Sequence, residues 1–180
     1  MNNSEIMYKK KICMIGSFGV GKTSLVKRFV HDIFDDRYLT TIGVKVTQKK
    51  CPPVQTPDKK YIQCDLLLWD IEGAEQLRSA TVNYYTGSSG ALLVSDLTRK
   101  ETIEAYSQLV EIFIKTNPRA KIILAGNKSD LMHDVSQASE PLKKFADKNR
   151  FPYFLTSAKT GQNVESAFFK FIELFFLKRS

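Results

Sequence analysis

Two kinds of apolar pattern alternate along this chain. Short, continuous apolar runs have the length of strands buried on both faces of a sheet, as in KKICMIG at residues 10–16, ALLVSD at 91–96 and KIILAGN at 121–127. Longer segments predict helices at about residues 22–30, 102–116, 139–148 and 164–178. This alternation is typical of a mostly parallel sheet with helices on both faces.

A β-hairpin is predicted in the middle of the chain. VKVTQKK at residues 44–50 alternates with period two, and YIQCDLLLWD at 61–70 is the second strand. The CPPVQTPD connection contains prolines, which cannot occupy a central strand, so we expect a long loop there. With a last strand at YFLTSA, residues 153–158, the pattern predicts an α/β three-layer sandwich of six strands, one of them antiparallel, and five helices.

Length and composition fit a single domain. With 180 residues, 43% of them hydrophobic, the chain can bury one sizeable core, and we assign residues 1–180 to one domain. The formal net charge is +8, but the lysines are scattered in pairs and triplets and are not interleaved with aromatic residues. We therefore expect a solvated charged surface and no nucleic-acid binding, with an acidic membrane or another phosphate-rich partner as the alternative.

Cysteine usage and the start of the chain favour a reducing, cytoplasmic location. Cys13, Cys51 and Cys64 form no C-x-x-C pair, and small buried thiols are expected where they fall in strands. No apolar run reaches membrane-spanning length, and no signal-peptide pattern follows the lysine-rich start. His31 and His133 lack metal-ligand spacing, so we expect both at the surface.

A glycine-rich loop follows the first predicted strand. GSFGVGKT, residues 16–23, matches G-x-x-x-x-G-K-[ST] between a strand and a helix. Its glycines let successive N–H groups turn inward around phosphate oxygens, and the helix N-terminus adds its positive end. Lys22 supplies a charge to the phosphates, and the Thr23 hydroxyl can ligate Mg²⁺. The motif indicates a P-loop NTPase whose nucleotide-binding loop comprises Phe18, Gly19, Val20, Gly21, Lys22, Thr23 and Ser24.

A second pair of motifs points to the base. NKSD, residues 127–130, ends a predicted strand, and a carboxylate there can accept from both N1–H and the exocyclic amine of guanine, a donor pair that adenine lacks. TSAK, residues 156–159, ends the next strand. An ordinary turn is the alternative for NKSD alone, since its residues favour turns. Ligands of such sheets bind beyond the carboxyl ends of the strands, where both motifs lie, so we favour guanine selection by Asp130.

With these motifs in order, the whole chain resembles the Ras superfamily of small GTPases, and looks most like its Rab and Ras branches. YLTTIGV and WDIEGAE match its two switch segments. The resemblance implies a monomeric switch in signalling or vesicle trafficking, in which GTP and Mg²⁺ order two loops and hydrolysis to GDP and phosphate releases them. It also implies that effectors, exchange factors and a GTPase-activating protein bind these loops.

The resemblance assigns roles around the base. Asn127 and Asp130 are implied to read its hydrogen-bonding edge, Lys128 to stack on it, and the Ala158 amide to bond its carbonyl oxygen. The full set implied to contact or support the base is Phe34, Asn127, Lys128, Asp130, Ser157, Ala158 and Lys159.

The resemblance also assigns the phosphate and metal contacts. Thr23, Thr41 and Asp70 are implied to hold Mg²⁺, Asp70 through a water, and the Thr41 backbone also meets the γ-phosphate. Tyr38 is implied to cover the phosphates, and the Gly73 amide to sense the γ-phosphate. On this basis catalysis depends on Lys22, Thr41 and Gly73.

One departure from the family lies in the second switch. Where most members have Asp-Thr-Ala-Gly-Gln-Glu, this chain has Asp-Ile-Glu-Gly-Ala-Glu, so Ala74 replaces the glutamine that orients the attacking water. Because this catalysis is mostly positioning and electrostatics, the loss should slow a reaction that is already slow without a partner. Compensation by Glu72, Glu75 or a partner's side chain is the alternative, although repulsion of the γ-phosphate disfavours Glu72.

Phe18 is the second departure, because the family keeps a small residue there. Its ring would stand near the γ-phosphate and on the path of an activating arginine, which is worth about 10³ to 10⁵ in rate. A ring folded outward without catalytic effect is the alternative. Both departures predict weak intrinsic hydrolysis, with a permanently GTP-bound scaffold as the competing hypothesis. A P-loop kinase or ATPase is disfavoured, because it would leave NKSD and TSAK unexplained.

The closing helix is apolar around much of its axis. Its predicted core row is Val164, Phe168, Phe171 and Phe175, and three apolar residues lie to the side, at Phe169, Ile172 and Phe176. We expect these three to be buried at the helix margins, with a partner, dimer or membrane-facing patch as the alternative. The chain has no cysteine after Cys64 to carry a lipid, so membrane association is expected only through a tail outside this chain or through partners.

Overall fold

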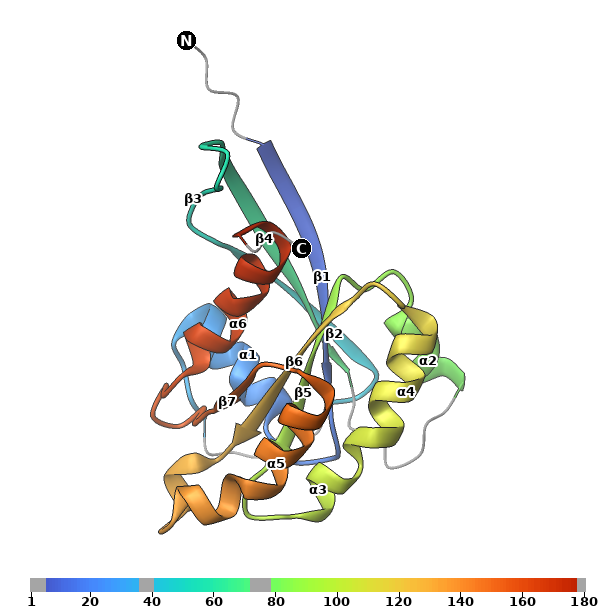
Figure 1. Ribbon diagram of the computed structural model, residues 1–180, viewed down its shortest axis with the longest axis vertical. Coiled ribbons are helices and arrows are strands. Elements are labelled where there is room, and N and C mark those ends of the chain that lie inside the picture. The colour runs from blue at the N-terminus through green and yellow to red at the C-terminus, as the bar shows by residue number, and fades with distance from the viewer. Residues whose placement is uncertain (1–5, 36–40, 72–78, 178–180) are drawn as a thin grey trace.

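The computed structural model describes residues 6–35, 41–71 and 79–177, which form a sheet between two layers of helices (Figure 1). The strands are β1 (Ile6–Ile15), β2 (Val44–Lys50), β3 (Val54–Gln55), β4 (Tyr61–Ile71), β5 (Gly90–Asp96), β6 (Lys121–Asn127) and β7 (Tyr153–Leu155). The α-helices are α1 (Lys22–His31), α2 (Ser79–Tyr85), α3 (Glu101–Glu104), α4 (Tyr106–Thr116), α5 (Val135–Asn149) and α6 (Val164–Ile172). A 3₁₀ turn covers Ser129–Leu131, and α6 continues as a π-helix over Glu173–Leu177.

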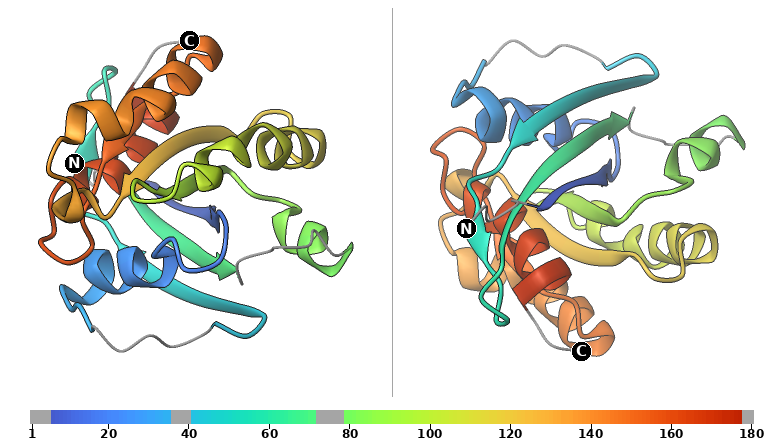
Figure 2. Two further views of the ribbon diagram at one scale, coloured as in Figure 1. Left: turned by 90° about the horizontal axis from the view of Figure 1, so that it is seen from below. Right: turned by 90° about the horizontal axis from the view of Figure 1, so that it is seen from above.

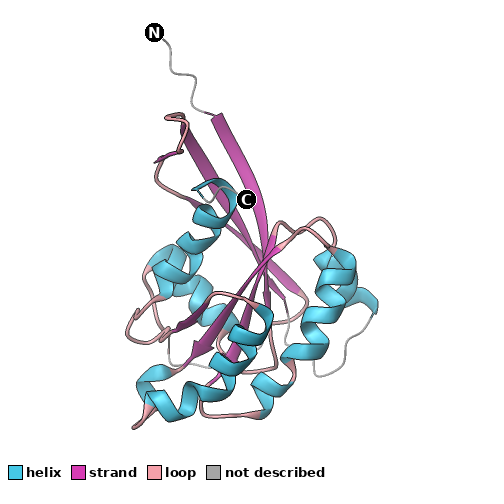
Figure 3. Cartoon of the chain, viewed as in Figure 1, coloured by secondary structure: helices cyan, strands magenta, loops and turns pink. Residues whose placement is uncertain are grey.

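The sheet is mostly parallel, as predicted. Its strand order is β2-β4-β1-β5-β6-β7, with β3 added beside β4. β1 pairs in parallel with β4 and β5, and β6 pairs in parallel with β5 and β7. Only β2 and β3 run antiparallel among the described strands, both against β4. The carboxyl ends of β1, β5 and β6 therefore meet at one edge of the sheet, the lower end in Figure 3.

Two apolar cores bury the two faces of the sheet. On one face α1 and α6 cover β1, β4 and β5, and the rings of Phe29 and Phe168 stack there with centroids 4.2 Å apart. On the other face α2, α3, α4 and α5 cover β5 and β6, where Tyr106 and Phe113 are fully buried. Both layers are visible on either side of the sheet in Figure 2. The three-layer α/β sandwich is thereby confirmed.

The predicted long connection of the hairpin is confirmed, except that it contains the two-residue strand β3. β3 resumes pairing with β4 after the two adjacent prolines, and the turn that follows spans residues 56–60. β1 and β4 extend together past the helices at the top of Figure 1, so the first strand begins at Ile6 rather than at residue 10. The sheet is consequently longer at this end than the sequence pattern predicted.

Several helix boundaries also differ from the prediction. The helix predicted from residue 139 begins at Val135, because the Asp134 side chain accepts a hydrogen bond from the Gln137 amide and caps it. Ala105 separates α3 from α4, which were predicted as one helix. The last strand ends at Leu155 rather than at residue 158, and α2 had no assigned range in the sequence pattern.

The end of the chain packs onto the sheet. Val164, Phe168 and Phe171 are buried as predicted, whereas Phe175 is only partly buried. Of the side residues, Ile172 is buried, and Phe169 and Phe176 pack partly buried against the same core, which confirms burial at the helix margins. His31 and His133 are exposed, as predicted. In the part of the chain that the structure describes, no helix is both long and apolar enough to cross a membrane.

Candidate nucleotide-binding site

A cavity of about 320 Å³ lies beyond the carboxyl ends of the strands. It brings together five separate parts of the sequence: the loop after β1 with the start of α1, the segment after α1, the end of β4, the turn after β6 and the turn after β7. Most of the predicted binding residues line it: Phe18, Gly19, Gly21, Lys22, Thr23, Ser24, Phe34, Thr41, Asn127, Lys128, Asp130, Ala158 and Lys159. Tyr38, Gly73, Ala74, Glu72 and Glu75 lie outside the described residues.

The phosphate loop needs its glycines for space as well as for backbone angle. Gly16, Gly19 and Gly21 all have positive φ, at 152°, 73° and 98°. A Cβ at Gly16 would stand 2.2 Å from the Val94 carbonyl oxygen, and one at Gly21 would stand 2.3 Å from Asn127 Nδ2. Any side chain at either position would therefore push the loop away from the sheet.

Lys22 lies inside this loop. Its Nζ donates to the carbonyl oxygens of Gly16 and Ser17, at 2.8 and 2.9 Å, so the loop wraps around the ammonium group. Burial lowers the pKa of Lys22 to about 8. The nearby Asp70 carboxylate partly offsets this effect by favouring the charged ammonium. A buried ammonium at the start of α1, where the first N–H groups of a helix have no partner within the helix, could bind a polyphosphate.

Three oxygen-bearing side chains meet beside Lys22. Thr23 Oγ1 donates to Asp70 Oδ2 at 2.6 Å and lies 2.8 Å from Thr41 Oγ1. Asp70 is 1% exposed, and its Oδ1 has no hydrogen-bond partner among the described residues. Burial raises the pKa of this carboxyl group, partly offset by the Thr23 hydrogen bond.

This trio fits Mg²⁺, which is the metal that the nucleotide motif implies. Mg²⁺ prefers hard oxygen ligands and binds through one or two carboxylates together with phosphates. Two hydroxyls and a carboxylate with a spare buried oxygen supply such donors, and a cation would relieve the cost of burying Asp70 charged. Thr23, Thr41 and Asp70 are thus brought together as the sequence predicted.

The base end of the cavity is built from the two polar turns. Asp130 Oδ1 accepts from Ser157 Oγ at 2.5 Å, which holds the carboxylate at the cavity wall. Lys128 has a left-handed backbone, with φ 65°, and its Nζ donates to Asp96 Oδ2 at 2.6 Å. The turn after β7 is fixed from outside by Arg28, which donates to the carbonyl oxygens of Ala158 and Lys159.

Asn127 connects the base end with the phosphate loop. Its Nδ2 donates to the Val20 carbonyl at 2.9 Å, and its Oδ1 accepts from the Ala158 amide at 3.2 Å and from Thr156 Oγ1 at 3.3 Å. The residue is buried, and its side chain holds the three loops of the site together. Direct base reading by Asn127 and Ala158 stays a prediction.

Phe18 and Phe34 flank the opening of the cavity. Phe18 is 38% exposed, and its carbonyl oxygen accepts a hydrogen bond from Arg99. Phe34 is partly buried and packs against the core beneath α1. Phe18 lines the cavity and is also partly open to solvent. Both predictions for its ring, near the γ-phosphate or folded outward, therefore stay open.

Sequence reasoning missed Asp96, Arg99 and Arg28. Asp96 is buried, and hydrogen bonds from Lys128 and Thr98 lower the pKa of its carboxyl group, although burial opposes the shift. The polar end of the ALLVSD strand was a signal for Asp96, because it lies at the ligand-binding edge. Arg28 gave no signal, since an arginine on a predicted helix is ordinary, and its partners lie 130 and 131 residues away.

Comparison with known proteins finds relatives over most of the chain. The model of the Ras family matches residues 11–176. The Ras-related protein Rab11E of Lotus japonicus is 40% identical over 167 residues, which cover 92% of this chain and 74% of that protein. The Ras-related protein RABA1c of Arabidopsis thaliana is 39% identical with the same coverage. The GTP-binding protein YPTM2 of Zea mays is 37% identical over 92% of this chain and 79% of its own length.

Proposed function

This chain belongs to the Ras family of small GTPases and is Rab-like, and we propose that it is a guanine-nucleotide switch with slow intrinsic GTP hydrolysis. One observation carries the proposal. A single cavity is lined by the phosphate loop with Lys22, by Thr23, and by the Asp130 carboxylate. Thr23 is hydrogen-bonded to Asp70, and we assign this pair to Mg²⁺ and Asp130 to guanine. A triphosphate, a metal and a base can therefore be bound by one molecule at one place.

Each part of the site contributes a distinct physical effect. The ammonium of Lys22 offsets the charge of the β- and γ-phosphates. Their negative charge in turn raises the pKa of Lys22, which burial has lowered. Mg²⁺, held by Thr23, Thr41 and Asp70, would neutralise charge that develops between those phosphates. Asp130 selects guanine because a base without the paired donors would leave the carboxylate desolvated and unpaired.

Hydrolysis is proposed to be slow because of two side chains. Ala74 has no polar group that could orient water, and Phe18 places a ring at the phosphate loop where an activating arginine would enter. The same two residues support a second candidate, a scaffold that stays GTP-bound. By analogy with the Ras-related relatives, we propose effectors and exchange factors as partners in trafficking or signalling.

Nucleotide selection tests the proposal. Calorimetry should show a strong preference of the purified protein for GDP and GTP over ADP and ATP in the presence of Mg²⁺. Asp130→Ala should lose most of this preference, whereas Asp147→Ala, which removes the same charge from an exposed position on α5, should keep it. Equal affinity of the unmodified protein for guanine and adenine nucleotides would refute the proposal.

Nucleotide identity separates the two candidates. The nucleotide extracted from purified protein should be followed over hours with Mg²⁺. Accumulating GDP supports a slow GTPase, and persistent GTP supports the scaffold.

A further inference from the structure

Two cysteines, Cys51 and Cys64, lie where the pairing of β2 with β4 would continue by one residue. The pairing of β2 with β4 ends at Lys50 opposite Asp65, so the next residues in antiparallel register are Cys51 and Cys64. Pairing resumes with Val54 opposite Ile62. Residues 51–53 thus lie opposite residues 63–64, and the additional residue is absorbed by the two adjacent prolines as a bulge.

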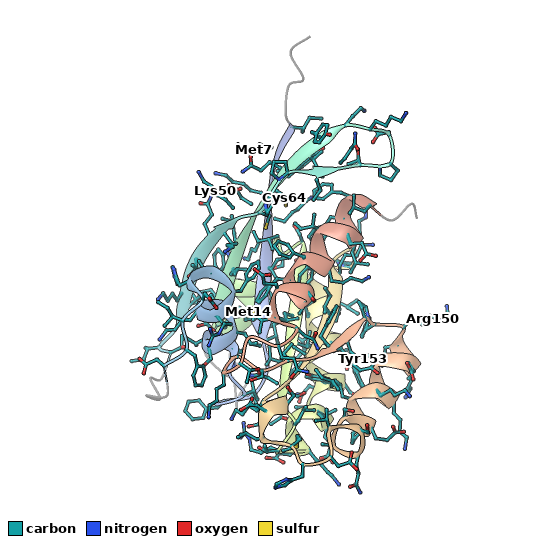
Figure 4. The ribbon with its side chains drawn as sticks, turned by 90° about the vertical axis from the view of Figure 1, so that its left-hand side faces the viewer. Met7, Met14, Lys50, Cys64, Arg150 and Tyr153 are labelled. Atoms are coloured by element: carbon teal, nitrogen blue, oxygen red, sulfur yellow. The ribbon has the colours of Figure 1, made fainter. Side chains whose placement is uncertain are left out.

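Both thiols are buried in the same core. Cys51 is 3% exposed and Cys64 is 1% exposed, and both belong to the apolar cluster between the sheet and the layer of α1 and α6. Figure 4 shows Cys64 at the upper part of the sheet, beside Lys50 and above Met14. Burial raises the pKa of Cys64 to about 12, and the neighbouring Cys51 thiol also raises it.

Directly opposed residues of an antiparallel pair are within reach of a disulfide. Their Cα atoms are about 4.5 to 5.5 Å apart, and a disulfide spans about 4.4 to 6.8 Å between Cα atoms. Their Cβ atoms are about 4.5 to 5.5 Å apart against about 3.5 to 4.5 Å in a disulfide, so a small inward shift is needed. The bulge next to Cys51 is where the backbone can supply that shift.

We propose that Cys51 and Cys64 form a reversible cross-strand disulfide when the protein meets a small disulfide oxidant such as oxidised glutathione. The thiolate of one cysteine attacks a glutathione sulfur and forms a mixed disulfide, with glutathione thiolate as the leaving group. The second cysteine thiolate then attacks the protein sulfur of that mixed disulfide and expels the second glutathione thiolate. The two cysteine protons pass through solvent to the two thiolates released.

Burial determines how fast this reaction proceeds. Burial also raises the pKa of Cys51 to about 11, so few thiolates exist at neutral pH and the reaction should accelerate as pH rises. Access requires the end of the hairpin to open locally. β3 pairs with β4 over only two residues, so we expect the hairpin to open from this end.

Cys13 supplies the matched control. It is also buried in the sheet but lies in the core of the other face, where its Sγ is 3.0 Å from Ser88 Oγ. Its burial raises its pKa to about 11, as for Cys51. Cys13→Ser should therefore keep the reaction, and Cys51→Ser or Cys64→Ser should abolish it.

The experiment uses the folded, unmodified chain with oxidised glutathione. After free thiols are alkylated, mass spectrometry should show loss of two hydrogens and a cross-linked peptide joining residues 51 and 64. The oxidised protein should unfold at a temperature higher by roughly 5 to 10 °C, and dithiothreitol should reverse the shift. Stable glutathione adducts without the cross-link, or oxidation only under denaturing conditions, would overturn the proposal. Because this measurement uses the unmodified chain, it remains decisive if a cysteine variant fails to fold.

Discussion

Arg99 Nη2 donates a hydrogen bond to the carbonyl oxygen of Phe18, 2.8 Å away and 81 residues earlier in the chain. Arg99 Nε also contacts Asp96 Oδ2 at 3.2 Å, and the same carboxylate oxygen accepts from Lys128 at 2.6 Å. The glycine-rich loop after β1 and the turn after β6 are thereby joined through one buried aspartate. The shape of each end of the site depends on the other.

Arg99→Ala should therefore weaken nucleotide binding. The lost hydrogen bond to the phosphate loop is worth about 1 kcal/mol, or roughly fivefold in affinity for GDP. Fluorescence titration with a labelled GDP measures the change. Arg119→Ala removes the same charge from an exposed position far from the cavity and serves as the control. Equal affinity of the two variants would contradict a positioning role for Arg99.

Ala74→Gln should accelerate single-turnover hydrolysis of bound GTP. The added amide can orient the attacking water, and we expect a gain of about tenfold or more. Ala74→Met has a similar length without the amide and should give no gain. A rate for the unmodified protein that equals or exceeds that of Ala74→Gln would show that another group already positions the water.

Nucleotide affinity should fall as pH rises above about 8. The free protein loses the Lys22 proton near its pKa of about 8, whereas bound phosphate raises that pKa, so binding above pH 8 must take up a proton. Affinity should be flat below this value and fall by up to about tenfold per pH unit above it. Titrations in buffers of different ionisation enthalpy measure the proton uptake. Lys22→Arg stays charged, so its affinity should not show the fall with pH that comes from Lys22. Ionisation of guanine at high pH affects both proteins alike.

Asp70→Asn should separate metal binding from stability. Burial raises the pKa of Asp70 above 3.8. Between pH 3.8 and the raised pKa, the free folded protein binds more protons than the unfolded chain, so its stability falls as pH rises across this interval. The neutral variant should therefore be at least as stable as the parent in urea at neutral pH without Mg²⁺. In GDP dissociation assays, it should lose about tenfold or more of the slowing that Mg²⁺ causes. An unchanged Mg²⁺ effect would exclude Asp70 from the metal site.

Phe168→Ala tests the core beneath α6. The side chain is fully buried and stacked on Phe29, so its removal should lower the free energy of unfolding by about 3 to 5 kcal/mol. Urea unfolding measures the loss. Ile114→Ala, at a partly exposed position on α4, should change stability by less than about 1 kcal/mol. Similar losses in both variants would mean that the Phe29–Phe168 stack does not anchor α6.

Periodicity predicted strands correctly where an apolar run was bounded by polar residues. The segments 44–50 and 121–127 coincide with β2 and β6. It failed where a contact between distant segments decides the boundary. The start of β1 at Ile6 depends on pairing with Ile62, and β3 exists only because Val54 pairs with the same residue of β4. The prolines correctly predicted a long connection there, but a pattern cannot show that two residues within it pair with β4.

The sequence by itself determined the chemistry of this protein. The phosphate loop, NKSD and TSAK each predict the groups that we propose to bind phosphate and base, because those groups act locally and their spacing is set by a single turn. Only the tertiary structure decided how the three loops hold one another through Asn127, Asp96, Arg99 and Arg28, and that Cys51 and Cys64 are buried in the same core. These partners are separated along the chain by from 3 to more than 100 residues, and only packing of the sheet brings the distant ones within contact distance.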